Sequence, residues 1–443
     1  MTGRYKAPRG TQDILPEDQP HWDFVREVAA SISKAFGYEA IKTPVFEEAS
    51  LFTRGVGEVT DIVQKEMYIF NDRSGLDLAL RPEGTAPVCR AYLEHGMHNL
   101  PQPVRLWYWT PIFRYDRPQA GRYRQHHQFG AEAIGDSSAA VDVEVIELLW
   151  RLYEELGLTN LTLQLNSIGD GKCRPHYLEV LRDYYRDKLD RVCDDDRVRF
   201  EQNPLRLLDC KQERCQPIIA GAPPITDYLC DDCTGHFTEL TALLEAADIP
   251  FTVNPRLVRG LDYYTRTVFE VIPPEEGAQS TIGGGGRYDG LIELLGGRPT
   301  PGVGFATGIE RTILNLQRQG IAVPQRDRPR IYVAIQTPAA RVPAFRLASD
   351  IRRAGISAVV STGDRSLKAQ MRHADALGAT YVAILGENEL AAKSATLRQL
   401  ADGAQETVPL IDVASRVGRA NIYHGMMDVC SVRRPQLRQR RRL

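Results

Sequence analysis

The chain has 443 residues, of which 43% are hydrophobic and 25% are charged, so it can bury a large core and is not disordered throughout. Its 55 basic and 57 acidic residues leave a formal net charge of -2, which excludes a chain-wide basic coat but not a local surface for nucleic acid. The N-terminus has no apolar signal segment and no run approaches about 18 apolar residues, so we expect a cytoplasmic protein with no membrane span.

The first 170 residues alternate between helical and strand-like patterns. Residues 18–36 carry apolar side chains at helical spacing and end at Gly37, which predicts a helix. Residues 38–47 are strand-like but contain Pro44, and proline inside such a run indicates an edge or interface strand. Further along, the pattern predicts strands at 76–84, 104–114, 123–135 and 161–170, and an amphipathic helix at 139–156.

The second half of the chain falls into three parts. Residues 171–250 hold charged helical patterns and four clustered cysteines, and we interpret them as an insertion in a larger sheet domain. Strands resume at 251–273, and a strand beginning at 302 leads into a helix. After a linker at 324–329, strands and helices alternate, which is typical of a small α/β domain with a mainly parallel sheet.

An arginine-rich hairpin is the first candidate functional segment. Between Arg114 and Arg124 the sequence also places Arg117 and Arg122, with Asp116 as the one acid among them. Guanidinium groups bind phosphate through two parallel hydrogen bonds, so this hairpin suits a polyphosphate ligand. The alternative is an ordinary solvated hairpin.

Three further segments could face a pocket. Arg259, Tyr263 and Tyr264 follow one another in a strand-like run, and Arg311 lies at the start of a predicted helix. The four glycines at 283–286 would let a backbone approach a ligand closely. Their spacing does not match the dinucleotide-binding fingerprint, and no Walker A pattern occurs. Each of these segments, taken alone, is also compatible with a purely structural role.

Together the segments resemble the class II aminoacyl-tRNA synthetases. The proline strand, the FRYD run at 113–116 and the strand and helix that end in Arg311 match the motifs of that class in order. The stretches at 259–267 and 283–291 are similar to the two signature stretches of the histidyl-tRNA synthetase family, as are PRGTQDILP at the start and RPEGTAP at 81–87. The resemblance covers roughly residues 5–425, and the tags of the class I synthetases are absent.

The resemblance implies an α/β (α+β) architecture in several parts. A catalytic domain over 1–325 would hold an antiparallel sheet flanked by helices, with the helical insertion at about 171–250. A C-terminal α/β anticodon-binding domain would span 326–425. The tail at 426–443, with six arginines in its last twelve positions, would either contact tRNA or be disordered without function. The Pro44 segment would form a homodimer.

The resemblance also implies a function and a set of site residues. The expected substrates are L-histidine, ATP with Mg²⁺, and histidine tRNA, and Arg114 and Arg259 are the expected catalytic residues. ATP would be held by Arg114, Asp116, Arg122, Arg259 and Arg311. Histidine would be held by Glu83, Thr85, Gln128, Glu132, Tyr263 and Tyr264. The tRNA acceptor end would meet Gln119 and Arg124. Two positions depart from the family pattern, since Asp116 replaces glutamate and His126 replaces phenylalanine.

Four cysteines form a candidate metal site. Cys210, Cys215, Cys230 and Cys233 read C-x4-C-x14-C-x2-C, a spacing that can place four thiolates around a structural zinc ion. Free thiols in a reducing compartment are the alternative. The other cysteines, Cys89, Cys173, Cys193 and Cys430, are expected to be unpaired and buried.

Two rival functions remain open at this point. A synthetase-like regulator that binds histidine or tRNA without catalysis would typically lack the signature arginine and the C-terminal domain, and this chain has both patterns. A plain α/β protein without a nucleotide site would require every motif above to be a coincidence.

Overall fold

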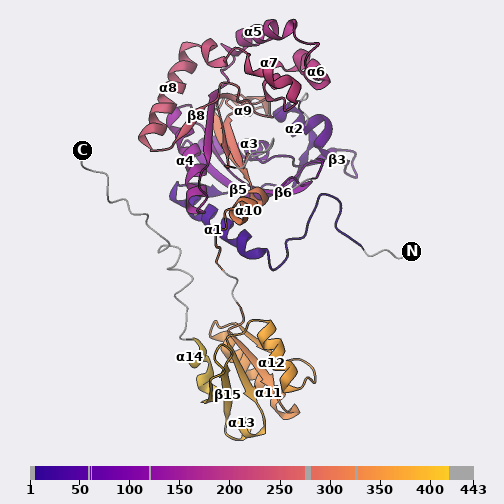
Figure 1. The fold of residues 1–443 in the computed structure, drawn as a ribbon, viewed down its shortest axis with the longest axis vertical. Helices are drawn as coiled ribbons and strands as arrows, with labels where there is room; N and C mark the ends of the chain where they lie inside the picture. The colour runs from indigo at the N-terminus through magenta and orange to yellow at the C-terminus, as the bar shows by residue number, and fades with distance from the viewer. Residues whose placement is uncertain are drawn as a thin grey trace, which may run out of the picture. The chain divides into compact units, whose positions relative to one another are not determined.

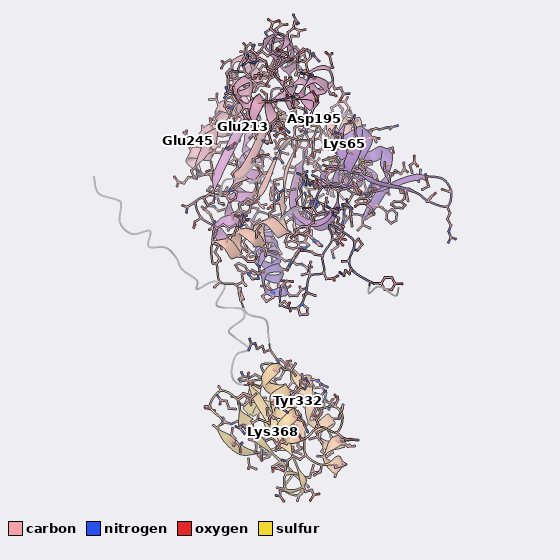
Figure 2. All side chains as sticks on the ribbon, turned by 45° about the vertical axis from the view of Figure 1, so that its right-hand side comes forward. Lys65, Asp195, Glu213, Glu245, Tyr332 and Lys368 are labelled. Atoms are coloured by element: carbon pink, nitrogen blue, oxygen red, sulfur yellow. The ribbon has the colours of Figure 1, made fainter. Side chains whose placement is uncertain are left out.

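The chain folds into two compact units. The computed structural model describes residues 5–57, 60, 62–118, 121–274, 281–324 and 328–418, and it divides into Met1–Pro324 and Gln325–Leu443. Figure 1 shows the ribbon of both units. Figure 2 adds their side chains, with Lys65 and Asp195 labelled in the first unit and Tyr332 and Lys368 in the second.

An eight-stranded sheet forms the centre of the first unit. Its strands follow the order β1-β5-β6-β11-β10-β9-β7-β8. The bounds are β1 (Glu39–Ala40), β5 (Val104–Phe113), β6 (Gln125–Ile134), β11 (Gly302–Gly308), β10 (Gly283–Arg287), β9 (Thr265–Ile272), β7 (Thr162–Ser167) and β8 (Phe251–Val253). Only the two outermost pairings, β1 with β5 and β7 with β8, are parallel. The predicted antiparallel sheet is therefore confirmed.

The main apolar core and several helices lie on one face of this sheet, and the site lies on the opposite face, which other helices cover in part. Successive side chains of a strand point to opposite faces, and in β6 Phe129 and Ala131 join the main apolar core. That core also contains side chains from α1 (Gln19–Ala35), α4 (Ala139–Glu155), α8 (Asp231–Ala246) and α10 (Ile309–Arg318). Gln128 and Glu132 alternate with these apolar residues and therefore lie on the opposite face.

The Pro44 segment links two different sheets. The predicted strand at 38–47 is two short strands, β1 in the large sheet and β2 (Phe46–Glu48) in a small sheet of order β2-β4-β3. The partners of β2 are β4 (Asp77–Leu80) and β3 (Tyr68–Asn71). Pro44 lies in the break because it has no N–H group to donate to a ladder. Two helices, α2 (Ala49–Val56) and α3 (Thr85–Glu94), and two short turns, η1 (Ile62–Glu66) and η2 (Met97–Asn99), complete this region.

The insertion is helical, as predicted, and has a core of its own. It contains α5 (Arg174–Arg186), α6 (Asp194–Gln202), η3 (Pro204–Asp209), η4 (Glu213–Cys215), α7 (Gln216–Ala220) and η5 (Ile225–Tyr228). Figure 1 shows α5, α6 and α7 gathered at one end of the first unit. Tyr177, Leu181 and Leu207 pack there with Leu257 and Tyr264. The insertion is thus fastened to the stretch that precedes β9, while α9 (Leu291–Leu294) follows β10.

The second unit is a mixed α/β domain. Its sheet has the order β13-β12-β14-β15-β16, with β12 (Ile331–Ile335), β13 (Ala358–Val360), β14 (Tyr381–Leu385), β15 (Ser394–Gln399) and β16 (Gln405–Pro409). The helices are α11 (Arg341–Arg353), α12 (Leu367–Ala376), α13 (Glu387–Ala391) and α14 (Val413–Gly418), with the turns η6 (Pro338–Ala340) and η7 (Leu410–Asp412). The first three strands are parallel, as expected, whereas β15 and β16 add an antiparallel hairpin that the sequence analysis did not predict. Among the helices that the structure describes in either unit, none combines the length and apolarity needed to cross a bilayer.

Candidate active site

A cavity of about 620 Å³ lies against the open face of the large sheet. Its walls come from α3, the β5–β6 hairpin, the stretch before β9, the glycine-rich β10 and the start of α10. Ten of the site residues expected from the sequence line this one cavity: Glu83, Thr85, Arg114, Asp116, Arg122, Gln128, Arg259, Tyr263, Tyr264 and Arg311. Segments far apart in the sequence therefore converge on a single site.

Three arginines make one side of the cavity strongly cationic. The Arg114 Nε atom donates to the Pro82 carbonyl at 2.7 Å, and Arg311 donates to two carbonyl groups at 2.8 and 2.9 Å. Burial lowers the pKa of Arg311, and the positive charges of Arg122 and Arg114 lower it further. Guanidinium groups gathered in this way are stabilised by a multiply charged anion such as a polyphosphate.

Arg259 lies on another wall, in an ion pair with Glu270. Burial opposes its charge, but Glu270 outweighs the effect and the pKa of Arg259 lies above its usual value. Its Nε atom is buried and has no hydrogen-bond partner, so this donor is available to a ligand. The space for this side chain comes from β10, because a Cβ atom at Gly284 would lie only 2.9 Å from Arg259 Nη1.

The four-glycine run forms the central strand β10, and two of its glycines, Gly283 and Gly284, line the cavity. In β10, Gly284 faces Arg259, and a Cβ atom at Gly286 would lie 3.0 Å from the ring of Tyr264. The absence of Cβ atoms thus gives these two side chains their space, and the close approach of the backbone to a ligand stays a prediction. A Cβ atom at either position would also clash with a backbone carbonyl of β9, that of Phe269 at Gly284 and that of Thr267 at Gly286.

Glu132 lies beneath the cavity and is fully buried. Its carboxyl group accepts hydrogen bonds from the hydroxyls of Thr85 at 2.8 Å, Tyr108 at 3.3 Å and Tyr288 at 2.7 Å. Burial raises the pKa of Glu132 to about 8, even though the hydroxyl donors favour the ionised form. Gly304 makes room for this group, since a Cβ atom there would overlap the carboxylate.

Polar groups at the start of α3 face the same space. The Glu83 carboxylate accepts the backbone N–H groups of Thr85 at 2.7 Å and Ala86 at 2.8 Å, so it occupies the favourable N-terminal end of the helix. Burial raises the pKa of Glu83, while these N–H groups act in the other direction. Across the cavity the Gln128 Oε1 atom is buried and has no hydrogen-bond partner.

Two expected residues, Glu132 and Arg124, lie outside the cavity lining, and a third, Gln119, is not described. Arg124 stacks over the Tyr115 ring at 3.8 Å and donates to the Asp116 carbonyl at 3.2 Å. Gln119 lies outside the described residues. The Asp116 carboxylate pairs with Arg122 and accepts the backbone N–H of Arg117 at 2.7 Å, so the shorter acid is held within the hairpin.

Sequence reasoning missed several side chains around the cavity, among them residues of the insertion. Tyr108, Tyr288 and Glu270 contact the expected residues directly, and Arg206 of the insertion donates to the Arg259 carbonyl at 3.1 Å. One signal was present for Tyr108, because it stands opposite Gly130 in the β5–β6 register. A glycine between polar residues of a strand marks a position where another group approaches closely.

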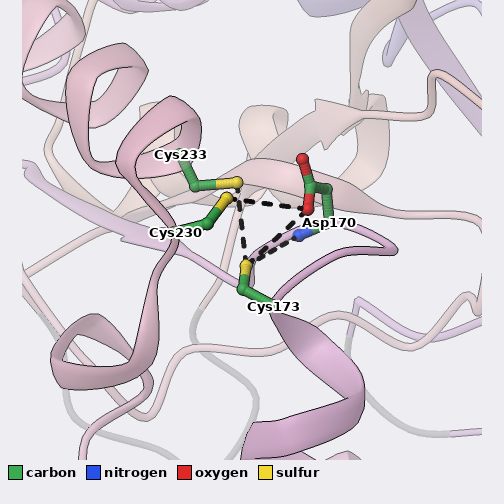
Figure 3. A group of neighbouring side chains, drawn as sticks. All are labelled: Asp170, Cys173, Cys230 and Cys233. Atoms are coloured by element: carbon green, nitrogen blue, oxygen red, sulfur yellow. Dashed lines mark hydrogen bonds between the residues drawn. The ribbon is translucent and has the colours of Figure 1, made fainter.

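The predicted four-cysteine zinc site is wrong. Cys230 and Cys233 cluster with Asp170 and Cys173, which we call the first cluster (Figure 3). Cys210 and Cys215 cluster with Cys193 and Asp196, the second cluster. Each cysteine pair has its own two partners, and the candidate ligand atoms of each cluster lie within 4.8 Å of one another. The two cysteine pairs therefore cannot share one ion.

Comparisons with known proteins agree with this geometry. The model of the family "Histidyl-tRNA synthetase" matches residues 10–169 and 226–312, and the model "Anticodon binding domain" matches residues 331–419. A histidine–tRNA ligase from Dehalococcoides mccartyi is 58% identical over 92% of this chain and 97% of its own length. One from Caldanaerobacter subterraneus is 50% identical over the same shares. The crystal structure of apo histidyl-tRNA synthetase from S. aureus superposes with a TM-score of 0.79 and 37% identity, over 94% of this chain and all of that one.

Proposed function

Because the chain belongs to the histidyl-tRNA synthetase family, we propose that it is an ATP-dependent histidine–tRNA ligase. In the first step the carboxylate of L-histidine attacks the α-phosphorus of ATP, forming histidyl-adenylate and releasing pyrophosphate. In the second step the 3′-hydroxyl of the terminal ribose of histidine tRNA takes the histidyl group and releases AMP. Charge builds up on phosphate oxygens in both steps, so fixed positive groups and correct positioning are the main catalytic requirements.

One observation carries the proposal. Within a single cavity, an acceptor (Gln128 Oε1) and a donor (Arg259 Nε) are both buried without partners. Buried polar atoms are normally hydrogen-bonded, so both atoms indicate a ligand that supplies their missing hydrogen-bond partners. An amino acid ammonium group fits the acceptor, and a phosphate or carboxylate oxygen fits the donor.

The arginine-lined wall is assigned to ATP. Arg114 holds the α-phosphate, Arg311 holds the γ-phosphate, and Arg259 lies near the α-phosphate and the histidine carboxylate. Asp116 and Arg122 complete the nucleotide contacts from the hairpin. Mg²⁺ accompanies the outer phosphates and takes one or two carboxylates in such sites.

The opposite side of the cavity is assigned to histidine. Glu83, Thr85 and Gln128 receive its ammonium group, while Glu132, Tyr263 and Tyr264 surround its imidazole. A neutral imidazole has one donor and one acceptor, and a carboxyl group with phenols can satisfy both. Since a site built to hydrogen-bond a polar side chain strongly disfavours apolar competitors, selection against other amino acids follows from the same groups.

The remaining assignments concern tRNA and the dimer. Residues 1–325 carry out both steps in the cytoplasm, and residues 326–425 contact the anticodon. Gln119 and Arg124 of the hairpin meet the acceptor end. A homodimer through the small sheet is supported by exposed apolar side chains on β2 and β3, where Phe46 is 47% and Ile69 53% exposed, since patches of this kind mark protein interfaces.

Amino-acid-dependent ATP–pyrophosphate exchange tests the proposal. We expect exchange with histidine alone among the twenty amino acids, and its loss in Arg259→Ala. Charging of histidine tRNA by the same preparation then tests the second step. A folded protein that binds histidine but exchanges with no amino acid would contradict the enzyme and favour the regulator.

A further inference from the structure

Six of the seven cysteines that the structure describes fall into the two clusters, each of which includes one aspartate. Within each cluster the four candidate ligand atoms lie within 4.8 Å of one another. In the first cluster the Asp170 carboxylate faces the sulfur atoms of Cys173, Cys230 and Cys233, as Figure 3 shows. The second cluster is built the same way around Asp196 and is buried at all four residues.

The spacing of these atoms is that of a tetrahedral metal site. Zn–S bonds of about 2.3 Å place sulfur atoms about 3.8 Å apart at the corners of a tetrahedron, and a Zn–O bond of about 2.1 Å shortens the sulfur–oxygen edge to about 3.6 Å. The sulfur atoms of Cys173 and Cys233 are 3.8 Å apart, and those of Cys193 and Cys210 are 3.6 Å apart. Asp170 Oδ1 lies 3.7 Å from the Cys173 sulfur and 4.0 Å from that of Cys230.

An independent observation points to a cation in the second cluster. Asp196 is fully buried, and its Oδ2 atom has no hydrogen-bond partner. Its Oδ1 atom accepts from Arg199 at 3.1 Å. A buried carboxylate oxygen without a partner is costly, and a metal ion among the three neighbouring sulfur atoms would satisfy it.

We infer that the chain binds two structural zinc ions, each through three cysteines and one aspartate. Three thiolates favour a soft or borderline ion, and zinc also accepts a carboxylate oxygen in tetrahedral geometry. The first ion takes Asp170, Cys173, Cys230 and Cys233, and the second takes Cys193, Asp196, Cys210 and Cys215. Six of these eight ligands lie between 170 and 225, outside the residues that the synthetase family model matches.

The two ions have different structural tasks. The first joins the beginning of α5 to the beginning of α8, so it clamps the two ends of the segment between these helices. The second holds α6 to η3 and η4 beside the cavity, which Cys193 and Cys210 help to line. Asn203, which lies between Cys193 and Cys210 in the sequence, donates to Asp262 at 2.7 Å. The segment from 193 to 210 thereby holds the stretch that carries Arg259.

Zinc content of the full-length chain tests the inference. Protein purified without a metal-binding tag is analysed by elemental mass spectrometry, and we expect two zinc ions per chain. Cys233→Ala and Cys210→Ala should each retain one ion. Cys89→Ala, which removes a buried cysteine outside both clusters, is the matched control and should retain two.

A second measurement needs no variant and so does not depend on how the variants fold. Titration of the native thiols with an organomercurial should release two zinc ions per chain, detected with a colorimetric chelator. Replacement by Co²⁺ should give sulfur-to-cobalt charge-transfer bands and the visible bands of tetrahedral cobalt. Native protein that holds one zinc ion or none, after reduction and incubation with zinc, would overturn the inference.

Discussion

Replacing Arg259 with glutamine removes the buried positive charge that is expected to stabilise the transition state. Loss of one preorganised donor of this kind costs about 100- to 1,000-fold in kcat, or roughly 2.7–4 kcal/mol. Because the Nε atom of Arg259 has no partner in the protein, the loss should fall on the transition state. We therefore expect ATP–pyrophosphate exchange to drop at least about 100-fold, mainly in kcat.

The ion pair with Glu270 complicates this experiment. The side chains of Arg259 and Glu270 are 19% and 20% exposed, so the glutamine variant leaves a mostly buried carboxylate without its cation. Breaking a fully buried pair costs about 3–5 kcal/mol, and the residual exposure puts the expected loss of unfolding free energy nearer 2 kcal/mol. A poorly folded variant would also lose activity, so stability and exchange must be measured together.

A double variant separates the two effects. Arg259→Gln combined with Glu270→Gln removes both charges, so the unfolding free energy should recover while exchange stays low. Glu270→Gln alone measures the contribution of the acid. Arg105→Gln serves as the matched control, because Arg105 also pairs with a glutamate, Glu144, at 2.8 Å but lies outside the cavity. If the double variant exchanges within about tenfold of the wild type, the electrostatic role of Arg259 is refuted.

Three other variants test separate parts of the site. Gly304→Ala should raise KM for histidine at least about tenfold with little change for ATP, since the added methyl displaces the Glu132 carboxylate; an equal rise for both substrates in exchange kinetics would contradict this role. Burial and the Arg114 charge lower the pKa of His126 to about 3, so the unfolded chain binds more protons than the folded one between pH 3 and about 6.5. The free energy of unfolding therefore falls as the pH falls. In His126→Phe its decrease between pH 7.5 and 5 should be about 2 kcal/mol smaller than in the wild type, as measured by denaturant titration. Phe46→Glu, which places a charge on the exposed apolar patch, should weaken the dimer at least about tenfold by analytical ultracentrifugation, and an unchanged dimer would move the interface elsewhere.

The sequence was most informative where chemistry and periodicity coincide. The predicted strand at 104–114 matches β5 to within one residue, the alternating stretch at 123–135 contains β6, and Arg114, which follows β5, lines the cavity. Positions of this kind can be predicted because a strand's two-residue period and a turn rich in guanidinium groups are both local properties. The roles proposed for these residues rest on the resemblance and remain to be tested.

Features that depend on distant contacts could not be predicted from the sequence. Cys210, Cys215, Cys230 and Cys233 are close in sequence and looked like one site, but one pair meets Cys173 at the start of α5 and the other pair meets Cys193 at the start of α6. Spacing among these four cysteines does not reveal which residues from earlier in the chain complete each cluster. The same limit applies to Glu132, whose three hydroxyl donors come from three separate elements.

The insertion helps to position the active site through two hydrogen bonds to the stretch at 259–262. Arg206 donates to the Arg259 carbonyl at 3.1 Å and Asn203 to the Asp262 carboxylate at 2.7 Å, and η3 carries or adjoins both. Neither contact touches the reacting atoms, yet each fixes the backbone on which the Arg259 side chain depends. Since catalysis of this kind relies on positioning, where a 1 Å displacement can cost about 100-fold, loss of the second cluster should lower kcat even though none of its ligands is assigned to bind substrate. The charge of Arg259 then stabilises the transition state directly. The second zinc ion contributes indirectly, because it holds the backbone at 259–262 in position.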